Sequence, residues 1–267
     1  AKNFQRFRWF WIYRKMKNTL SKKQIERYSR QIVLKNIGAV GQQKILKSKV
    51  LIVGSGGLGC PVTDTLCRAG VGTIGIVDND KVSLSNIHRQ SFFTSKDVGK
   101  YKVKILKERI KLINPETKTI IFKEKITKLN IKKIIKNFDI IVDGSDNFKT
   151  KFLLNEYSLK YKKILIIGAI SKFDGHIFSF NFNNKKTSCL KCFYQTEITD
   201  EFLDCESEGV LGTIAGIVGN IQANEVIKII LKLDNSLDSS ILIINLLTLS
   251  FRKVKFLKKK NCACKKK

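Results

Sequence analysis

Short apolar runs alternate along the chain, up to about residue 170, with longer segments in which apolar residues recur every three or four positions. The short runs predict buried strands, and the longer segments predict helices that cover them. We expect strands at 49–53, 73–77, 120–122, 140–142 and 164–169, and helices at 59–69, 100–113, between 122 and 140, and at 147–161. Strands that alternate with helices form a mostly parallel sheet with helices on both faces, so we predict a Rossmann-like α/β fold.

The pattern changes after Gly175, where single apolar residues alternate with polar ones. Such alternation is typical of an antiparallel strand with one exposed face. We expect one such strand, then a long helix, then a closing hairpin, at 176–182, 213–231, and 241–245 with 250–256. The C-terminal part therefore continues the parallel sheet with antiparallel strands.

The N-terminal residues differ from the rest of the chain. Residues 1–15 hold both tryptophans and several basic residues, and we expect them to form a flexible extension. Ser21 and Gln24 have the spacing of a capping box, which predicts a helix from there to about Leu34. We expect residues 16–267 to form a single domain.

The charge balance favours anionic partners. Lys and Arg number 51 against 22 Asp and Glu, which gives a formal net charge of +29. A charge of this size suits nucleotides, nucleic acids, acidic proteins or membrane surfaces and does not choose among them. No apolar run approaches the roughly 18 residues of a membrane span, and no signal-peptide pattern is present. We therefore expect a cytoplasmic protein without a membrane span.

A glycine-rich loop predicts a nucleotide site. Gly54-x-Gly56-x-x-Gly59 follows an expected strand and opens an expected helix, and Asp78 ends the next strand. Glycines let the backbone approach a phosphate, the helix N-terminus offers free N–H groups, and the acid accepts ribose hydroxyls. The P-loop pattern, with its Gly-Lys-Ser/Thr ending, is absent. The loop alone does not separate ATP from NAD, so an NAD-dependent oxidoreductase stays open.

Seven motifs in a fixed order give the chain a family resemblance from about residue 21 to its end. They are Arg27-Tyr-Ser-Arg30-Gln31, Gly54-Ser-Gly-Gly-Leu-Gly-Cys60, Asp78-Asn-Asp80, Leu84-Ser-Asn86-Ile-His-Arg89-Gln90, Val98-Gly-x-x-Lys102, Asp143-Gly-Ser-Asp146-Asn147 and Cys189-x-x-Cys192. Together they resemble the MoeB/ThiF branch of the ubiquitin-activating-enzyme superfamily.

The resemblance implies an ATP-dependent adenylyltransferase that works as a homodimer. Its substrate would be the C-terminal glycine carboxylate of a small ubiquitin-like sulfur-carrier protein of molybdopterin or thiamine biosynthesis, and pyrophosphate would leave. A tRNA-modifying dehydratase relative shares the adenylating core, but such relatives usually lack the paired cysteines Cys189 and Cys192. We therefore expect no stable nucleic-acid partner.

The resemblance also assigns roles by position. Catalytic roles fall to Arg30, Arg89, Lys102 and Asp146, with Arg30 reaching into the partner subunit's site and Asp146 holding Mg²⁺. Nucleotide-binding roles fall to Gly54, Gly56, Gly57, Gly59, Asp78, Asp80, Ser85, Asn86 and Asn147. Cations suit the reaction because a carboxylate must approach a negatively charged phosphate. Taken singly, Arg30 could be a surface charge, Arg89 a loop ion pair, and Asp146 a helix cap.

The cysteines suggest a metal site. Cys189, Cys192, Cys262 and Cys264 offer four thiolates, enough for one tetrahedral Zn²⁺ that would fix the C-terminal tail. The single residue between the last two makes a shared site harder to form, and four reduced thiols beside a frayed tail are the alternative. Cys205 lies where relatives carry a cysteine that transfers sulfur covalently, although its acidic neighbours disfavour a thiolate. We expect no sulfurtransferase domain after residue 267.

Overall fold

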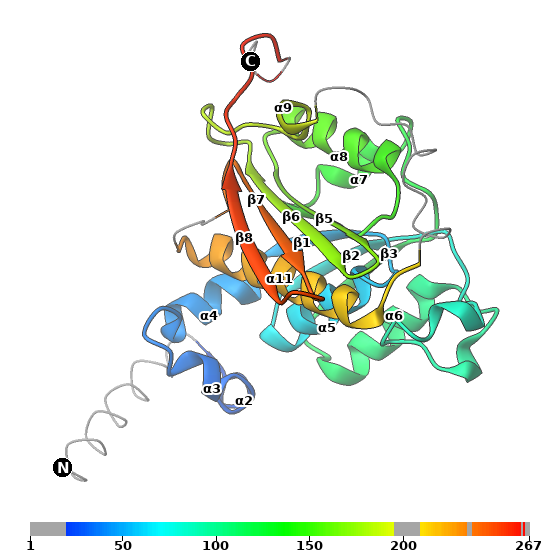
Figure 1. The fold of residues 1–267 in the computed structure, drawn as a ribbon. Coiled ribbons are helices and arrows are strands. Elements are labelled where there is room, and N and C mark those ends of the chain that lie inside the picture. The colour runs from blue at the N-terminus through cyan, green and yellow to red at the C-terminus, as the bar shows by residue number, and fades with distance from the viewer. Residues whose placement is uncertain (1–19, 195–208, 234–236, 263, 265–267) are drawn as a thin grey trace.

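The expected strands form one eight-stranded sheet in the order β3-β2-β1-β4-β5-β6-β7-β8 (Figure 1). The computed structural model describes residues 20–194, 209–233, 237–262 and 264. The strands are β1 (Lys49–Val53), β2 (Thr73–Val77), β3 (Lys118–Phe122), β4 (Ile140–Asp143), β5 (Ile164–Ser171), β6 (Asp174–Asn181), β7 (Ser240–Asn245) and β8 (Ser250–Lys255).

Strands β1 to β5 pair in parallel, and β5 to β8 pair in antiparallel fashion. The predicted fold class is therefore confirmed, including the change of direction in the C-terminal part. The chain moves outward from β1 to β2 and β3 and then crosses back to β4 beside β1. Reversal of the strand order leaves a crevice at the carboxyl ends of β1 and β4, where open α/β sheets bind ligands.

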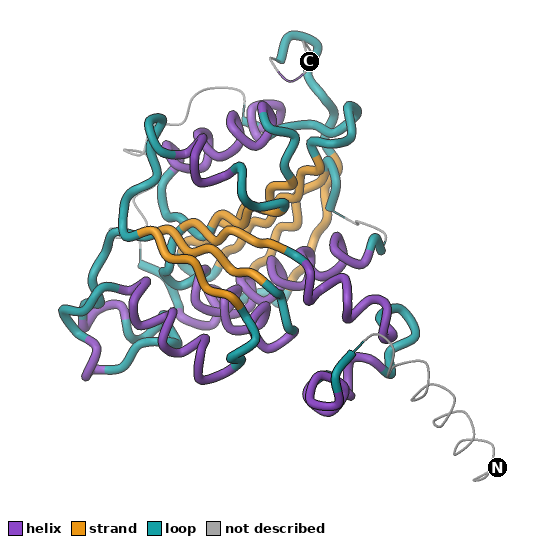
Figure 2. The backbone as a smooth tube through the Cα atoms, turned by 180° about the vertical axis from the view of Figure 1, so that it is seen from behind, coloured by secondary structure: helices purple, strands orange, loops and turns teal. Residues whose placement is uncertain are grey.

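Helices cover both faces of the sheet (Figures 1 and 2). One face carries α5 (Gly59–Ala69), α6 (Lys102–Ile113) and α11 (Gly212–Leu231), and the other carries α7 (Ile131–Ile135), α8 (Phe148–Lys160) and α9 (Leu190–Phe193). Two short 3₁₀ helices, η1 (Leu84–Asn86) and η2 (Ser95–Asp97), lie between β2 and α6. The central strands are buried on both sides, which explains their continuous apolar runs.

The single helix predicted from Ser21 to Leu34 is wrong. The segment forms α2 (Lys22–Arg27) and α3 (Ser29–Ile32), and a further helix, α4 (Gly38–Lys47), follows. The capping box at the start of α2 is present. The break falls at Tyr28, whose buried ring packs against Gly70 and whose hydroxyl accepts a hydrogen bond from Asn114 Nδ2 at 2.9 Å. Tertiary packing of one aromatic side chain thus overrides the local helix pattern.

Helix α11 is the one described helix with the length and apolar composition that a membrane span would need. Half of its most apolar 18-residue window is buried. It packs against β5, β6 and α5, and Ile214, Val218 and Val226 contribute to the core on that face. Its position is that of a core helix.

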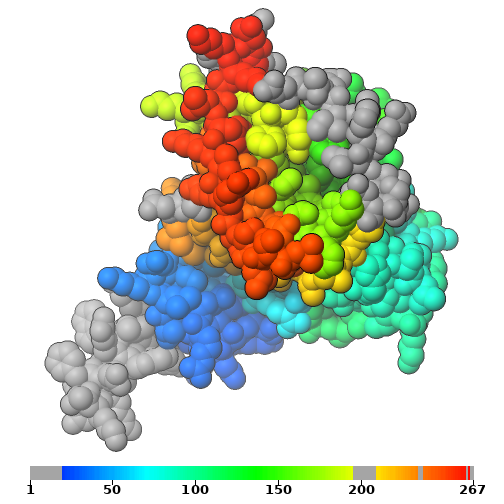
Figure 3. Space-filling model, viewed as in Figure 1, coloured from blue at the N-terminus to red at the C-terminus, as the bar shows by residue number. Residues whose placement is uncertain are grey.

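The hairpin of β7 and β8 ends the sheet and lies across one face of the molecule (Figure 3). Every residue of β8 is exposed, and no strand pairs with its outer edge within the described part of the chain. Phe256, directly after β8, packs its ring against Phe178, Phe180 and Phe193. These aromatic contacts lead the C-terminal segment back to the body of the protein.

The close packing around Gly72, which lies between α5 and β2, leaves no room for a side chain. A Cβ atom there would overlap the backbone carbonyl oxygen of Leu46. We therefore expect Gly72→Ala to lower the free energy of unfolding by about 1–3 kcal/mol, measured by urea denaturation. Gly216→Ala is the matched control, because no atom lies within 4 Å of its added Cβ and alanine favours the helix by up to ~1 kcal/mol. Equal stability of the two variants would contradict the packing described here.

Candidate functional site

A cavity of about 640 Å³ opens at the carboxyl ends of β1, β2, β4 and β5. This volume lies in the usual range for small-molecule sites. Ten of the residues singled out in the sequence line it, namely Gly54, Gly56, Gly57, Asp78, Asp80, Asn86, Arg89, Lys102, Asp146 and Asn147. Gly59, Ser85 and Arg30 are described but do not line it. The sheet therefore brings together residues from five separate segments of the chain, at 54–57, 78–80, 86–89, 102 and 146–147.

The glycine loop owes its shape to close backbone contacts. Gly54 adopts a φ of +93°, and a Cβ on it would lie 2.7 Å from the carbonyl oxygen of Gly144. A Cβ on Gly59 would overlap the carbonyl oxygen of Gly54. The loop leads directly into α5, whose first N–H groups have no partner in the helix itself. Such an N-terminus attracts anions through its N–H groups and the helix dipole.

Asp78 connects this loop to the end of β2. Its carboxylate accepts hydrogen bonds from the backbone N–H of Ser55 and of Asp80, both at 2.7 Å. Burial raises the pKa of Asp78 above its ordinary value of 3.8, although these hydrogen bonds and the charge of Lys102 oppose the shift. The carboxylate thus faces the cavity with part of its hydrogen-bonding capacity used by the protein.

Two cationic side chains line the same cavity. Lys102 is the first residue of α6, is only 5% exposed, and donates from Nζ to Asp80 Oδ2 at 3.1 Å. Arg89 follows η1 and donates from a guanidinium nitrogen to the carbonyl oxygen of Ser85 at 3.0 Å. Ser85 therefore contacts the site through Arg89. The remaining N–H groups of the Lys102 ammonium and of the Arg89 guanidinium are suited to phosphate oxygens.

The turn after β4 contributes Asp146 and Asn147. Asn147 is the N-cap of α8, and its Oδ1 accepts from the backbone N–H of Thr150 at 2.9 Å. The alternative in which Asp146 caps this helix is therefore wrong. Asp146 is exposed at the cavity and accepts from Asn147 Nδ2 at 3.1 Å. Its carboxylate has free lone pairs of the kind that Mg²⁺ prefers.

Sequence reasoning missed several residues of the cavity. Lys151 and Asp143 form a buried ion pair at 3.1 Å behind the turn, and Lys125 and His176 line the cavity farther along. Burial lowers the pKa of His176, although the charge of Asp174 opposes this shift.

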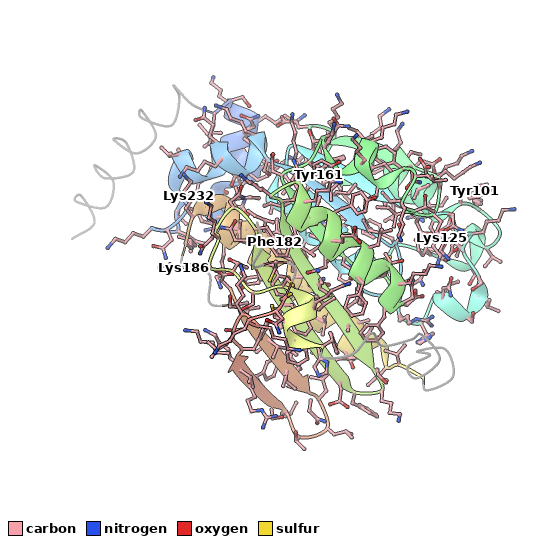
Figure 4. All side chains as sticks on the ribbon, turned by 90° about the horizontal axis from the view of Figure 1, so that it is seen from above. Tyr101, Lys125, Tyr161, Phe182, Lys186 and Lys232 are labelled. Atoms are coloured by element: carbon pink, nitrogen blue, oxygen red, sulfur yellow. The ribbon has the colours of Figure 1, made fainter. Side chains whose placement is uncertain are left out.

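Figure 4 shows Lys125 and Tyr101, the residue before Lys102, on the same side of the molecule, opposite Lys186 and Lys232. Asp143 was visible in the aspartate motif, but its partner, eight positions later in a lysine-rich helix, carried no distinguishing pattern.

One predicted catalytic residue lies apart from this arrangement within the described part of the chain. Arg30 is exposed on α3, and it does not reach the cavity of its own chain. Cys205 falls outside the described residues, as do residues 1–15.

The four expected cysteines come together in a second cluster. Their sulfur atoms all lie within 4.8 Å of one another, and all four side chains are buried. Cys189 Sγ lies 3.8 Å from Cys192 Sγ and 3.5 Å from Cys262 Sγ, and Cys192 Sγ lies 3.4 Å from Cys264 Sγ. Zn–S bonds of ~2.3 Å in a tetrahedron place sulfurs about 3.8 Å apart. The short Cys262-x-Cys264 spacing therefore does not prevent all four thiols from meeting.

Comparison with known proteins gives matches over most of the chain. Residues 28–266 match the model of the ThiF family. The chain is 38% identical over 244 residues to a "Probable molybdopterin-synthase adenylyltransferase" of Gracilaria tenuistipitata var. liui, covering 91% of this chain and 68% of the relative. It is 33% identical over 246 residues to the "Sulfur carrier protein adenylyltransferase" of Thermus thermophilus, covering 91% of each.

Among solved structures, the crystal structure of E. coli MccB with ATP superposes with a TM-score of 0.80 at 21% identity. The match covers 96% of this chain and 80% of MccB, and at this identity it shows the shared fold alone. The chain spans from 50% to 91% of the length of the curated relatives it matches. The resemblance carried by the seven motifs is confirmed.

The environment of Asp78 gives a prediction for the ligand-free protein. We expect this carboxyl to titrate above 3.8, measured by NMR with Asp78→Asn to assign its resonance, because burial disfavours the charged form. Since the folded-state pKa lies above the unfolded-state one, the stability that Asp78 contributes is present below the unfolded-state pKa and is lost as the pH rises through the folded-state pKa. A midpoint at or below 3.8 would contradict the burial of this group.

Proposed function

Because this chain belongs to the ThiF family, we propose that it is an ATP-dependent adenylyltransferase that activates the C-terminal carboxylate of a small ubiquitin-like sulfur-carrier protein. The observation that carries the proposal is that the glycine loop, Asp78, Arg89, Lys102 and Asp146 line the same cavity. The relatives are named as adenylyltransferases of molybdopterin synthase or of a sulfur carrier. Both pathways, molybdopterin and thiamine biosynthesis, suit this chemistry.

The reaction joins two anions, and the cavity supplies the cations that it needs. The terminal carboxylate of the carrier attacks the α-phosphate of ATP, a carboxy-adenylate forms, and pyrophosphate leaves. Arg89 and Lys102 neutralise the phosphates as charge moves toward the leaving group. Lys102 suits this role because it is buried while its partner Asp80 is exposed, so a phosphate can share the ammonium. Charge-assisted bonds of this kind are the strong ones.

The remaining lining residues bind the nucleotide. Asp78 accepts the ribose hydroxyls, as acids at the end of the second strand do in this fold. Gly54, Gly56 and Gly57 let the loop backbone and the start of α5 approach the phosphates, with Gly59 keeping the loop and α5 in close contact. Asn86 and Asn147 also line the cavity and would hold the triphosphate, and Ser85 orients Arg89.

Mg²⁺ fits the exposed carboxylate of Asp146. Bound there, the ion would neutralise part of the phosphate charge and so favour attack by the carboxylate. Asp146 supplies a single carboxylate, which agrees with the way Mg²⁺ is usually held, by one or two carboxylates together with substrate phosphates and water.

We also propose a homodimeric, cytoplasmic enzyme in which residues 16–267 form one domain. Arg30 is exposed and does not line its own cavity, which supports a role for its guanidinium in the cavity of a partner subunit. Cys205 is not required for adenylation, since the chemistry above uses no thiol.

Zn²⁺ occupies the four-cysteine cluster in this proposal. Four buried sulfurs within 4.8 Å match the size of a tetrahedral thiolate site. Such a site is structural, because it leaves no open coordination position. It would tie the segment after β8, which carries Cys262 and Cys264, to Cys189 and Cys192 at α9.

The first test is ATP–pyrophosphate exchange that depends on a carrier with a Gly-Gly terminus. We expect Arg89→Ala and Lys102→Ala each to lower kcat/KM at least about 100-fold, because each removes a cation from the transition state. Lys104→Ala, an exposed lysine of the same helix α6, should retain wild-type exchange. Hydride transfer from NADH without any ATP turnover would instead favour an oxidoreductase and overturn the proposal.

The second test asks whether Arg30 acts between subunits. Mixing Arg30→Ala and Asp146→Ala subunits in equal amounts should restore about a quarter of wild-type exchange, because half of the dimers are mixed and each holds one complete site. Arg89→Ala mixed with Asp146→Ala is the control and should restore nothing, since both residues line one cavity. Absence of recovery in the first mixture would refute the role of Arg30 in the partner's site.

The third test concerns the metal. We expect one Zn²⁺ per chain by elemental analysis, and its removal by a chelator should lower the free energy of unfolding by at least ~2 kcal/mol. Cys192→Ser should lose the zinc. Cys67→Ser, at a buried thiol outside the cluster, should keep it. Purified protein with no zinc and undiminished stability would rule the site out.

A further inference from the structure

The most deeply buried ammonium at the cavity belongs to Lys151 of α8. Its side chain is 4% exposed. Nζ donates to Asp143 Oδ2 at 3.1 Å, to the carbonyl oxygen of Ser145 at 2.6 Å and to the carbonyl oxygen of Gly168 at 2.7 Å. A protonated lysine has three hydrogens, and each one has an acceptor here. Although Lys151 lines the cavity, its hydrogens are therefore already used by the protein.

These three acceptors belong to three different parts of the sheet edge. Asp143 ends β4, Ser145 lies in the turn that follows, and Gly168 lies in β5. Asp143 in turn accepts from the backbone N–H of Ser145 at 2.9 Å and from its hydroxyl at 2.6 Å. The ammonium of Lys151 thus links the end of β4 and the turn after it to the neighbouring strand β5.

The network extends to the opposite face of the sheet and to the glycine loop. Gln222 of α11 donates from Nε2 to the carbonyl oxygen of Asp143 at 2.9 Å. Gly144 lies against the loop, because a Cβ on it would approach the backbone nitrogen of Gly59 to 3.1 Å. A shift of this turn would therefore displace both Asp146 and the nucleotide loop.

We propose that Lys151 is a positioning residue that fixes the turn at 144–147, and with it Asp146, for the metal-bound triphosphate. The inference rests on the proposed adenylation and adds a residue that does not itself touch the substrate. Partners that orient a metal-binding carboxylate typically change metal affinity or activity 10–100-fold when they are removed.

The test is the Mg²⁺ concentration that gives half-maximal ATP–pyrophosphate exchange. Lys151→Met should raise it about tenfold or more, because Ser145 and Gly168 lose their donor and Asp143 becomes an unpaired buried anion. The carrier concentration that gives half-maximal exchange should change less than about twofold. The reason is that Asp146 is proposed to bind the metal and not the carrier. Lys149→Met is the matched control, because Lys149 is an exposed lysine of the same helix and lies outside the cavity lining.

A double variant separates positioning from stability. Lys151→Met with Asp143→Asn removes the buried anion yet keeps an oxygen that accepts from Ser145, so thermal stability should recover relative to the single variant. The raised Mg²⁺ requirement should persist, because neither carbonyl oxygen regains its donor. The double variant also allows the Mg²⁺ requirement to be measured if the single variant Lys151→Met fails to fold.

Two results would overturn the inference while the proposed function stands. One is wild-type exchange with an unchanged Mg²⁺ requirement in the double variant. The other is a requirement that recovers in step with thermal stability, which would make Lys151 merely structural. If the wild-type protein shows no exchange at any Mg²⁺ concentration, the proposed function itself fails.

Discussion

The whole site depends on the close approach of two turns at the carboxyl ends of β1 and β4. The glycine loop and the turn after β4 touch backbone to backbone, so that a Cβ at Gly54 would lie 2.7 Å from the carbonyl oxygen of Gly144. Side chains are excluded at this contact, and the space above it remains open as a cavity. Because the strand order reverses here, residues from distant parts of the chain converge on the same space.

The charge pattern of the site follows from burial and has little to do with the net charge of +29. Most lysines lie on solvated faces, where water screens them. Lys102 and Lys151 differ from these lysines, because each is buried beside a carboxylate. They differ from each other in how many N–H groups of the ammonium are free to bind a ligand. Lys102 pairs with an exposed acid and can share its charge with a phosphate, whereas the hydrogens of Lys151 are bound to three oxygens that shape the turn.

The sheet was predictable because its central strands are buried on both faces and appear as continuous apolar runs, as at 49–53 and 140–142. The helix break at Tyr28 was not, since it depends on a ring packed against Gly70, which lies far along the chain. Ten lining residues could be named from ordered motifs. Lys151 could not, because only its distance from Asp143, Ser145 and Gly168 distinguishes it from other lysines.

The central claim is that this cavity binds ATP with its α-phosphate exposed to an incoming carboxylate. A crystal structure of the protein with Mg²⁺ and a non-hydrolysable ATP analogue tests it most directly. The account predicts the ribose at Asp78, the phosphates against the glycine loop and within hydrogen-bonding distance of Arg89 and Lys102, and Mg²⁺ at Asp146. An empty cavity under saturating nucleotide, or phosphates bound away from Arg89 and Lys102, would contradict it.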